Sequence, residues 1–293
     1  MKDTTGSART HLTLSTAGAT LCAVPLKDLR DRTAVVTGGA SGIGRALSLL
    51  FAREGANVVV ADLDEAGMAE TVAGVGKAGR RGLAVRTDVS RLADVQALAD
   101  RAFEELGGVH VVCNNAGVAL WGGLESVTHQ DWEWAMGVNL WGVIHGVEAF
   151  VPRLVAQKQP GHVVNTASMA GLIASQGLGV YNTTKYAVVG LSETLQKDLR
   201  GYDIGVSVLC PMGVNTNIRH SDRNRPAALR NEEKAREGRA VELIGRYLAP
   251  EHVAERVLRA IYANRLYVIT HEEGLTPLKR RFERMVQAIE ECK

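Results

Sequence analysis

The chain has 293 residues, of which 46% are hydrophobic, and its formal net charge at pH 7 is +2. A chain of this length and apolar content can bury the core of one α/β domain. The small net charge argues against nucleic acid or a membrane surface as the main partner. No apolar run reaches the roughly 18 residues that a transmembrane helix needs, so none is expected.

The cysteines show no metal-binding or redox spacing. Cys22, Cys113, Cys210 and Cys292 are scattered, and two of them lie inside apolar, strand-like runs. A cysteine in such a run usually behaves as a small buried apolar residue. We therefore expect a cytoplasmic protein with no disulfide and no bound metal.

The first 29 residues show little of the periodicity of a folded element. Lys2 and Arg9 precede a mildly apolar stretch of small residues over 12–24, which faintly resembles a secretory signal. We favour a flexible tail over 1–29, followed by a single folded domain over 30–293.

A glycine-rich segment follows the first predicted strand. The β-branched run over 33–37 leads into Gly-Gly-Ala-Ser-Gly-Ile-Gly over 38–44, and a helical pattern follows over 45–54. Glycines let the backbone turn sharply and approach a phosphate, while the helix N-terminus offers free N–H groups. In this context the segment predicts a dinucleotide-binding turn, with contacts from Gly38, Ser41, Gly42, Ile43 and Gly44.

A single carboxylate favours one cofactor over another. The second predicted strand, over 57–61, ends at Asp62, about 20 residues beyond the glycine turn. A carboxylate there can accept hydrogen bonds from the adenosine ribose hydroxyls and would repel a 2′-phosphate, which favours NAD over NADP. Arg45, just after the turn, weakens this preference slightly. Asp62 could also cap the helix that begins near residue 65, and both roles can coexist.

Strand and helix patterns alternate through the rest of the chain. Helical patterns cover 65–77, 92–106, 129–155, 181–200, 251–263 and a last stretch from 275, and strand patterns cover 82–87, 109–113, 162–167, 204–209 and 266–270. This alternation predicts an α/β, doubly wound Rossmann fold, with helices on both faces of a seven-stranded parallel sheet.

Two segments extend this pattern near the C-terminus. The stretch over 212–250 becomes polar, irregular and arginine-rich from 217 onward, and its length and place predict a lid. The last helix, predicted over 275–291, has an apolar stripe that could pack on its own domain or on a neighbouring subunit. The stripe consists of Leu278, Phe282, Met285 and Ile289.

The candidate catalytic groups lie over 168–185. Tyr181 and Lys185 are four residues apart, which on a helix places them on one face. An adjacent cation favours the phenolate, so it lowers the pKa of a tyrosine from about 10 toward neutrality. Ser168 follows the strand over 162–167, at the carboxyl edge where open α/β sheets bind ligands, and could hold a substrate oxygen there.

In this order, the motifs resemble those of the classical short-chain dehydrogenase/reductase family over about 33–270. The likeness rests on Thr-Gly-Gly-Ala-Ser-Gly-Ile-Gly (37–44), Asp62, Asp88, Asn-Asn-Ala-Gly (114–117), Asn139, Ser168, Tyr-Asn-Thr-Thr-Lys (181–185) and Pro-Met-Gly-Val-Asn-Thr (211–216). It implies that Tyr181 is the general acid/base and that Ser168 holds the substrate oxygen. It further implies that Lys185 lowers the tyrosine pKa and binds the nicotinamide ribose, and that Asn139 fixes a water in a proton relay.

The resemblance implies further cofactor contacts and one departure. The contacts to NAD would come from Asp88, Val89, Asn115, Ala116, Gly117, Pro211, Gly213, Val214 and Thr216, besides Tyr181 and Lys185. The family usually has glycine after the proline, where this chain has Met212, so the backbone path beside the nicotinamide is less certain. The region over 266–289 looks similar to a branch that includes bacterial dehydrogenases of benzylic alcohols.

The expected substrate wall is mostly apolar. It comprises Met169, Leu172, Gln176, Leu178, Met212 and Trp121, beside the substrate contacts of Ser168 and Tyr181. Such a wall suits a secondary alcohol or ketone on a hydrophobic or aromatic molecule. The lid arginines could meet an anionic substrate or form a solvated face.

Two other functions stay open at this stage. One is an NADPH-dependent ketone or 3-oxoacyl-thioester reductase, which Asp62 disfavours. The other is a non-catalytic NAD-binding scaffold or sensor, which the intact catalytic set disfavours. The resemblance also implies a homodimer or homotetramer that assembles through the helices over 129–155 and 181–200.

Overall fold

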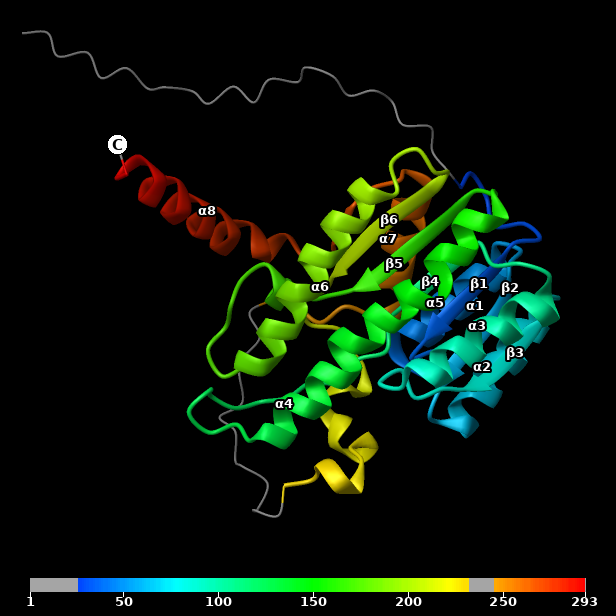
Figure 1. The fold of residues 1–293 in the computed structure, drawn as a ribbon, viewed down its shortest axis with the longest axis horizontal. Helices are drawn as coiled ribbons and strands as arrows, with labels where there is room; N and C mark the ends of the chain where they lie inside the picture. Colours follow the sequence, from blue (N-terminus) through cyan, green and yellow to red (C-terminus); the bar gives the residue numbers. More distant parts are fainter. Residues whose placement is uncertain (1–25, 232–244, 293) are drawn as a thin grey trace, which may run out of the picture.

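A single parallel sheet forms the centre of the protein. The computed structural model describes residues 26–231 and 245–292. The sheet has seven strands in the order β3-β2-β1-β4-β5-β6-β7, and Figure 1 labels β1 to β6. Every neighbouring pair is parallel, which confirms the predicted sheet. The strands are β1 (Thr33–Thr37), β2 (Asn57–Asp62), β3 (Gly82–Arg86), β4 (Val111–Asn114), β5 (Gly161–Thr166), β6 (Ile204–Cys210) and β7 (Tyr267–Ile269).

Helices cover both faces of this sheet, as the alternating pattern predicts. They are α1 (Gly42–Arg53), α2 (Glu65–Lys77), α3 (Leu92–Leu106), α4 (His129–Met136), α5 (Gly142–Gln157), α6 (Gly179–Asp198), α7 (Pro250–Tyr262) and α8 (Leu275–Glu290). Within the described residues, none of these helices is both long and apolar enough to cross a membrane.

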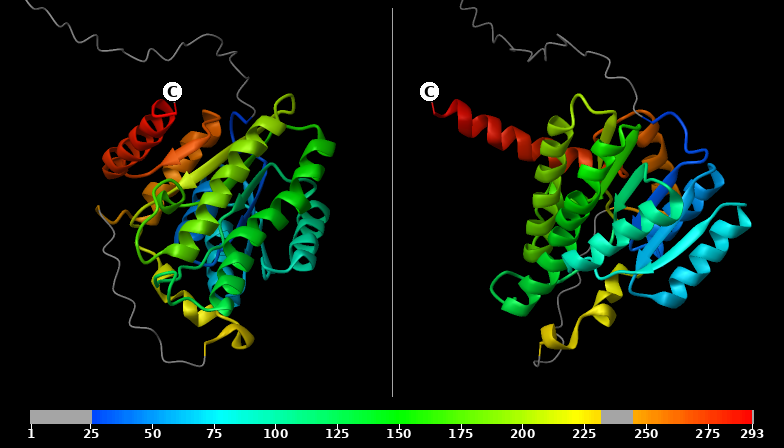
Figure 2. Two further views of the ribbon diagram at one scale, coloured as in Figure 1. Left: turned by 60° about the vertical axis from the view of Figure 1, so that its left-hand side comes forward. Right: turned by 45° about the vertical axis from the view of Figure 1, so that its right-hand side comes forward.

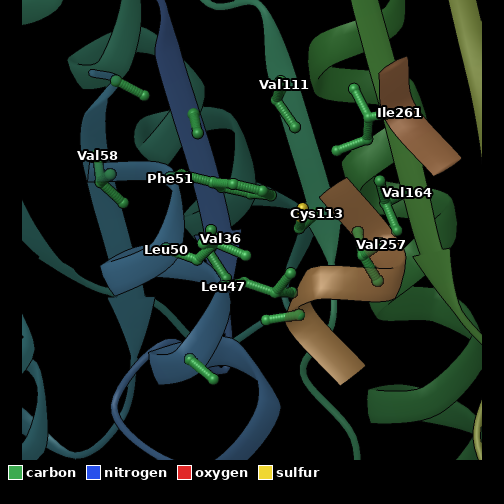
Figure 3. Close-up of a cluster of buried hydrophobic side chains, with 14 of the residues drawn as sticks. Val36, Leu47, Leu50, Phe51, Val58, Val111, Cys113, Val164, Val257 and Ile261 are labelled. Atoms are coloured by element: carbon green, nitrogen blue, oxygen red, sulfur yellow. The ribbon is translucent and has the colours of Figure 1, made fainter. Parts of the chain in front are cut away.

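Successive residues of one strand feed two separate cores. Val36 belongs to a cluster with side chains of α1, α2 and α7, whereas Val35 belongs to a cluster with side chains of α3, α5 and α6. Side chains alternate between the faces of a strand, so a sheet covered on both sides buries every position of its inner strands β1 and β6. Figure 3 shows part of the first cluster, with Phe51 of α1 and Ile261 of α7 over the sheet.

The strand order reverses between β1 and β4. From β1 the chain proceeds to β2 and β3 on one side, and from β4 to β7 on the other. The connections therefore diverge above the carboxyl ends of β1 and β4 and leave a crevice at that point. The glycine turn and the Asn-Asn-Ala-Gly turn both end up there.

The helix predicted over 129–155 is interrupted. It consists of α4, a π-helical turn over Gly137–Trp141 and then α5. Such single π turns are rare and often occur at functional sites. This one contains the fully buried Asn139, and a 3.6-residue period cannot reveal it.

The folded domain begins earlier than predicted. Leu26 and Leu29 are 1% and 0% exposed and belong to the core cluster beneath α1. The flexible tail predicted over 1–29 is therefore wrong for these residues, because two leucines are anchored in the core. The part of that prediction over 1–25 lies outside the described residues.

The last helix projects from the domain. Figures 1 and 2 show α8 leaving the body after β7, with most of its length away from the other helices. Phe282, Met285 and Ile289 of the predicted stripe are 51%, 48% and 67% exposed. Near the start of the helix, the Arg281 guanidinium lies 5.3 Å from the ring centroid of Tyr186 in α6. Packing of the whole stripe on its own domain is thus excluded.

The contrast between two phenylalanines tests this arrangement. Phe51 is 0% exposed, so Phe51→Ala should lower the free energy of unfolding by about 3–5 kcal/mol through lost burial and a cavity. The exposed Phe282 serves as the matched control, and Phe282→Ala should cost less than about 1 kcal/mol. Urea unfolding measures both. A loss at Phe282 as large as that at Phe51 would mean that α8 is covered in solution.

Candidate active site

A pocket opens where the strand order reverses. Its walls are the turn after β1, the ends of β2 and β3, the turn after β4, the start of α6 and the segment after β6. Most of the predicted cofactor residues line it, namely Gly38, Ser41, Gly42, Ile43, Asp62, Asp88, Val89, Asn115, Ala116, Gly117, Tyr181, Lys185, Pro211 and Thr216. Residues from six elements therefore converge as the motifs predict.

The glycine turn after β1 leaves no space for side chains at two of its positions. Gly38 has a φ of +66°, and a Cβ on it would lie 2.9 Å from the Ala116 Cα. A Cβ on Gly44 would collide with the Gly38 carbonyl oxygen. Only glycine at both places lets the turn lie against the strand and leave its N–H groups open to a ligand.

A threonine that the sequence reasoning missed ties the two turns together. The Thr37 hydroxyl accepts hydrogen bonds from the backbone N–H groups of Asn115 (2.9 Å) and Ala116 (3.1 Å). The Asn115 amide in turn donates to the Thr37 carbonyl at 3.0 Å. Thr37 ends a buried strand, and a β-branched residue is expected in a strand. The sequence pattern therefore gave no sign that its hydroxyl also binds the second turn.

Asp62 lies at the end of β2 and faces the pocket. Its Oδ2 accepts from the Ala40 N–H at 3.0 Å, and its Oδ1 accepts from the Leu63 and Asp64 N–H groups at 2.8 and 3.1 Å. The helix cap of α2 is Asp64, whose Oδ1 accepts from the Gly67 N–H at 3.0 Å. The alternative role of Asp62 as that cap is therefore wrong.

Arg45 turns away from the pocket. Its guanidinium pairs with Glu70 at 2.9 Å and donates to the carbonyls of Ala40 and Gly67. These contacts hold the side chain against α2, on the far side of the turn. Arg45, which weakened the sequence-based preference for NAD over NADP, is therefore bound to α2 and not directed into the pocket.

The catalytic candidates share one end of the pocket. The Lys185 ammonium lies 5.5 Å from the ring centroid of Tyr181 and donates to the Thr166 carbonyl at 2.9 Å. The Ser168 hydroxyl donates to the Pro211 carbonyl at 3.2 Å. The helix spacing, the end of β5 and the loop after β6 bring these groups together from three places in the chain.

Asn139 acts on the backbone of the turn after β4. Its Oδ1 accepts from the Val118 N–H at 2.8 Å, and its Nδ2 donates to the Val118 carbonyl at 2.9 Å. A Cβ on Gly117 would lie 3.3 Å from that Oδ1 and 3.6 Å from the Lys185 ammonium. The π turn thus places Asn139 within reach of the space beside Lys185.

Burial dominates the ionisation of the tyrosine. Desolvation raises the pKa of Tyr181 above its ordinary value, while the Ser168 hydroxyl opposes this increase. Lys185 was expected to lower the pKa of Tyr181, but the protein's own residues do not lower it. Burial also lowers the pKa of Lys185 to about 8, so the lysine is mainly charged at neutral pH, but at a cost.

Eleven predicted residues do not line the pocket. Three of them, Gly44, Asn139 and Ser168, lie just behind its wall. Trp121, Leu172 and Leu178 of the predicted substrate wall also lie outside it.

The other five residues make other contacts or face solvent. Met169 is buried and would contact any Cβ placed on Gly274, Gln176 is exposed, and Met212 donates its N–H to His271 at 3.4 Å. Gly213 pairs its carbonyl with the Leu248 N–H at 2.9 Å, and the Val214 side chain belongs to the core cluster. The loop after β6 turns these groups toward α7 and the C-terminal region, which short motifs could not reveal.

Other pocket residues were missed. Trp134 and Val138 line the wall from α4 and the π turn. Ile218, Ser221 and the lid arginine Arg223 line it from the segment predicted as a lid over 212–250, of which 232–244 lies outside the described residues. Their positions follow from loop paths rather than from local pattern. Within the described residues, no group of three or more His, Cys, Asp or Glu side chains is placed to hold a metal ion.

Comparisons with known proteins agree with this geometry. Residues 32–227 match the family model described as short chain dehydrogenase. The chain therefore belongs to the short-chain dehydrogenase/reductase family, as its motifs predict.

Individual relatives cover most of the chain. A Sphingobium protein named C alpha-dehydrogenase is 34% identical over 275 residues, which are 90% of this chain and 88% of that one. A Streptomyces avermitilis 1-deoxy-11-beta-hydroxypentalenate dehydrogenase is 37% identical over 260 residues, covering 87% and 90%. A solved Burkholderia phymatum short-chain dehydrogenase/reductase in complex with NAD superposes with a TM-score of 0.85 at 42% identity, covering 90% and 96%.

The buried lysine should lower stability. Since its folded-state pKa is about 8 and its unfolded value is about 10.4, Lys185 binds its proton more weakly in the folded protein. Unfolding therefore takes up a proton between these pH values, and stability rises with pH there. Lys185→Met should raise the free energy of unfolding at pH 7 by about 1–3 kcal/mol, and this gain should shrink as the pH approaches 10.

Urea unfolding at pH 7, 9 and 10 measures that difference. Lys197→Met, an exposed lysine of the same helix, is the control and should change stability by less than about 0.5 kcal/mol at each pH. A Lys185→Met protein that is less stable than the parent at pH 7 would contradict the burial cost.

Proposed function

We propose that this chain is an NAD(H)-dependent oxidoreductase that interconverts a secondary alcohol and a ketone on a hydrophobic substrate, aromatic molecules included. The observation that carries the proposal is that Tyr181 and Lys185 line the same pocket as the glycine turn, with the Ser168 hydroxyl beside the Tyr181 phenol. A bound nicotinamide ring would accept or donate the hydride.

The chain's own residues handle the proton and the orientation. The Tyr181 phenol exchanges a proton with the substrate oxygen, and Ser168 holds that oxygen by a hydrogen bond. The protein's own residues leave the pKa of Tyr181 raised. Lys185, charged below its pKa of about 8, would therefore favour the phenolate only together with the positive charge of a bound oxidised nicotinamide ring. Asn139 fixes the Val118 backbone and so keeps the turn after β4 in place beside Lys185.

The pocket fits NAD. Gly38 and Gly44 leave space that a Cβ would fill, which suits a pyrophosphate against the backbone N–H groups of the turn. Asp62 would accept from the ribose hydroxyls and repel a 2′-phosphate, while Arg45 is held by Glu70. The NAD complex of the Burkholderia phymatum protein supports this choice. An NADPH-dependent ketone or 3-oxoacyl-thioester reductase is the alternative.

The names of the relatives favour an alcohol-oxidising role on a bulky substrate. One is called a C alpha-dehydrogenase and another a dehydrogenase of a hydroxypentalenate. We also propose that the chain forms a homodimer or homotetramer. We further propose that it works in the reducing cytoplasm, where the buried thiols of Cys113 and Cys210 stay free. A non-catalytic scaffold is disfavoured because Tyr181 and Lys185 both line the pocket.

Cofactor titration tests the NAD assignment. The chain should bind NAD at least about tenfold more tightly than NADP, because a 2′-phosphate would meet the Asp62 carboxylate. Asp62→Asn should narrow this preference, whereas Glu65→Gln, which removes an exposed charge outside the pocket, should leave it unchanged. Preferential NADP binding by the unmodified chain would move the proposal to the reductase alternative.

Tyrosine replacement tests the catalytic assignment. Tyr181→Phe should lower kcat by about 10²–10⁴-fold or more, since it removes the acid/base, and should leave NAD binding largely unchanged. Tyr186→Phe, in the same helix but against Arg281, is the control and should keep kcat. Absorbance of the reduced nicotinamide with a panel of aryl and long-chain secondary alcohols measures both. Undiminished turnover by Tyr181→Phe would remove the assigned role.

A further inference from the structure

One peptide group at the edge of the pocket is held from both sides. Pro211 lines the pocket, and its carbonyl accepts hydrogen bonds from the Ser168 hydroxyl at 3.2 Å and from the Met169 N–H at 2.9 Å. At the other end of the same peptide bond, the Met212 N–H donates to His271 Nδ1 at 3.4 Å. Because a peptide bond is planar and rigid, a side chain that fixes its N–H also fixes the direction of its carbonyl.

The hydrogen bonds of His271 determine which of its nitrogens carries the hydrogen. Its Nε2 lies 3.0 Å from the Arg246 carbonyl, which can only accept, so Nε2 is the donor. Nδ1 is therefore the accepting nitrogen of the neutral ring, as the bond from Met212 requires. The Thr270 hydroxyl lies 2.6 Å from Nδ1 and donates to it as well. The side chain is 2% exposed, so water has little access to replace these partners.

The ring of His271 lies where three parts of the chain meet. His271 itself follows β7, and Arg246 lies shortly before α7. Near Arg246, the Leu248 N–H donates to the Gly213 carbonyl at 2.9 Å, and the Leu248 carbonyl accepts from the Asn215 N–H at 2.9 Å. His271 therefore connects the loop after β6, the chain before α7 and the end of β7.

A second contact from the same region reaches the residue next to Ser168. A Cβ on the buried Gly274 would collide with the end of the Met169 side chain. The region after β7 thus supports Ser168 from two directions, through the side chain of Met169 and through the peptide that His271 holds.

The Ser168 hydroxyl is oriented by two hydrogen bonds. It accepts from the Ala170 N–H at 3.1 Å and donates to the Pro211 carbonyl. A hydroxyl oxygen has two lone pairs, so one of them stays available for a substrate hydroxyl. The direction of the Pro211 carbonyl therefore decides where that lone pair points.

We propose that His271 is a positioning residue for the reaction, because it holds the Pro211–Met212 peptide through the Met212 N–H and so orients the Ser168 hydroxyl toward the substrate oxygen. The inference rests on the proposed function for the role of Ser168. It assigns a task at the site to a residue that lies outside the pocket and more than one hundred positions after Ser168 in the sequence.

Two substitutions separate the two nitrogens of the ring. In His271→Asn, the side-chain oxygen is the same number of bonds from Cβ as Nδ1, so it can accept from Met212 but cannot reach Arg246. In His271→Gln, the side-chain NH₂ is the same number of bonds from Cβ as Nε2, so it keeps the contact with Arg246 and loses that with Met212. Both variants lose the buried ring, so a difference between them reports which contact matters.

Hydrogen exchange at Met212 tests the contact without any substrate. NMR of the whole chain labelled with ¹⁵N-methionine follows this amide. In His271→Gln it should exchange about tenfold faster than in the parent, because the N–H has lost its acceptor. In His271→Asn it should stay within about threefold of the parent. Equal exchange rates in the parent and in His271→Gln would overturn the proposal.

Turnover of a secondary alcohol tests the consequence for the reaction. His271→Gln should lower kcat by about tenfold, since a misplaced contact to the reacting oxygen slows the chemical step, and His271→Asn should restore most of this loss. The KM for NAD should change by less than about threefold in both variants, because Asp62 is held by other contacts. Equal kcat values for the two variants would contradict the assigned role.

A buried histidine far from Ser168 gives the matched control. His162 is fully buried near the start of β5, and its Nε2 lies 2.8 Å from the Ser207 hydroxyl oxygen. His162→Gln also removes a buried, hydrogen-bonded ring, but it should leave kcat within about twofold of the parent.

A double-mutant cycle with Ser168 separates positioning from general damage. If His271 acts through the Ser168 hydroxyl, then His271→Gln should change kcat by less than about twofold once Ser168 has been replaced by alanine. The same tenfold loss with and without the Ser168→Ala substitution would mean that His271 only stabilises the fold, and the proposal would fail.

The two proposals can fail separately. If no alcohol in the panel is turned over, the proposed function fails, while the Met212 exchange rates still decide whether His271 holds the peptide. If turnover occurs but neither Met212 exchange nor kcat responds to His271→Gln, the proposed function holds and the positioning role fails.

Discussion

The contact between the turn after β1 and the turn after β4 is the constraint on which the site depends. Gly38 approaches Ala116 so closely that any side chain would meet the backbone, and the Thr37 hydroxyl binds the N–H groups of Asn115 and Ala116. Parallel strands with diverging connections create the crevice, but this contact gives it a fixed width. Asp62, through the Ala40 N–H, fixes the other side of the same turn.

The catalytic end is organised at the expense of stability. Lys185 is 3% exposed and Asn139 is fully buried, and burial shifts the ionisation of both Tyr181 and Lys185 toward their neutral forms. Buried ionisable side chains are retained where function requires them and where other contacts offset the loss in folding stability. The two large cores on the faces of the sheet, which meet at alternate residues such as Val35 and Val36, supply that stability.

The C-terminal region closes the site from behind. Met212, which stands where the family usually has glycine, donates its N–H to the buried His271, and His271 Nε2 contacts the Arg246 carbonyl. Met169 packs toward Gly274. These contacts connect the loop after β6 to the region after β7, so a chain without that region would hold the loop differently. The buried ion pair of Arg225 with Asp131 provides a comparable connection on the side of α4.

The sequence by itself determined the order and type of the elements and the residues at the pocket. Helices over 65–77 and 92–106 and the strand over 33–37 match the structure to the residue, because their patterns are long, regular and bounded by turn residues. The glycine turn, Asp62, Tyr181 and Lys185 were found because local spacing fixes their geometry.

Only the tertiary structure decided the features that depend on distant partners. The π turn around Asn139, the burial of Leu26 and Leu29, and the helix cap at Asp64 instead of Asp62 each follow from packing that no local period records. The predicted substrate residues Met169, Gln176 and Met212 do not line the pocket, because their positions depend on loop paths that no local motif records. Arg225 and Asp131 are 94 positions apart in the sequence by their numbers, and only the fold brings these charges together in a buried pair.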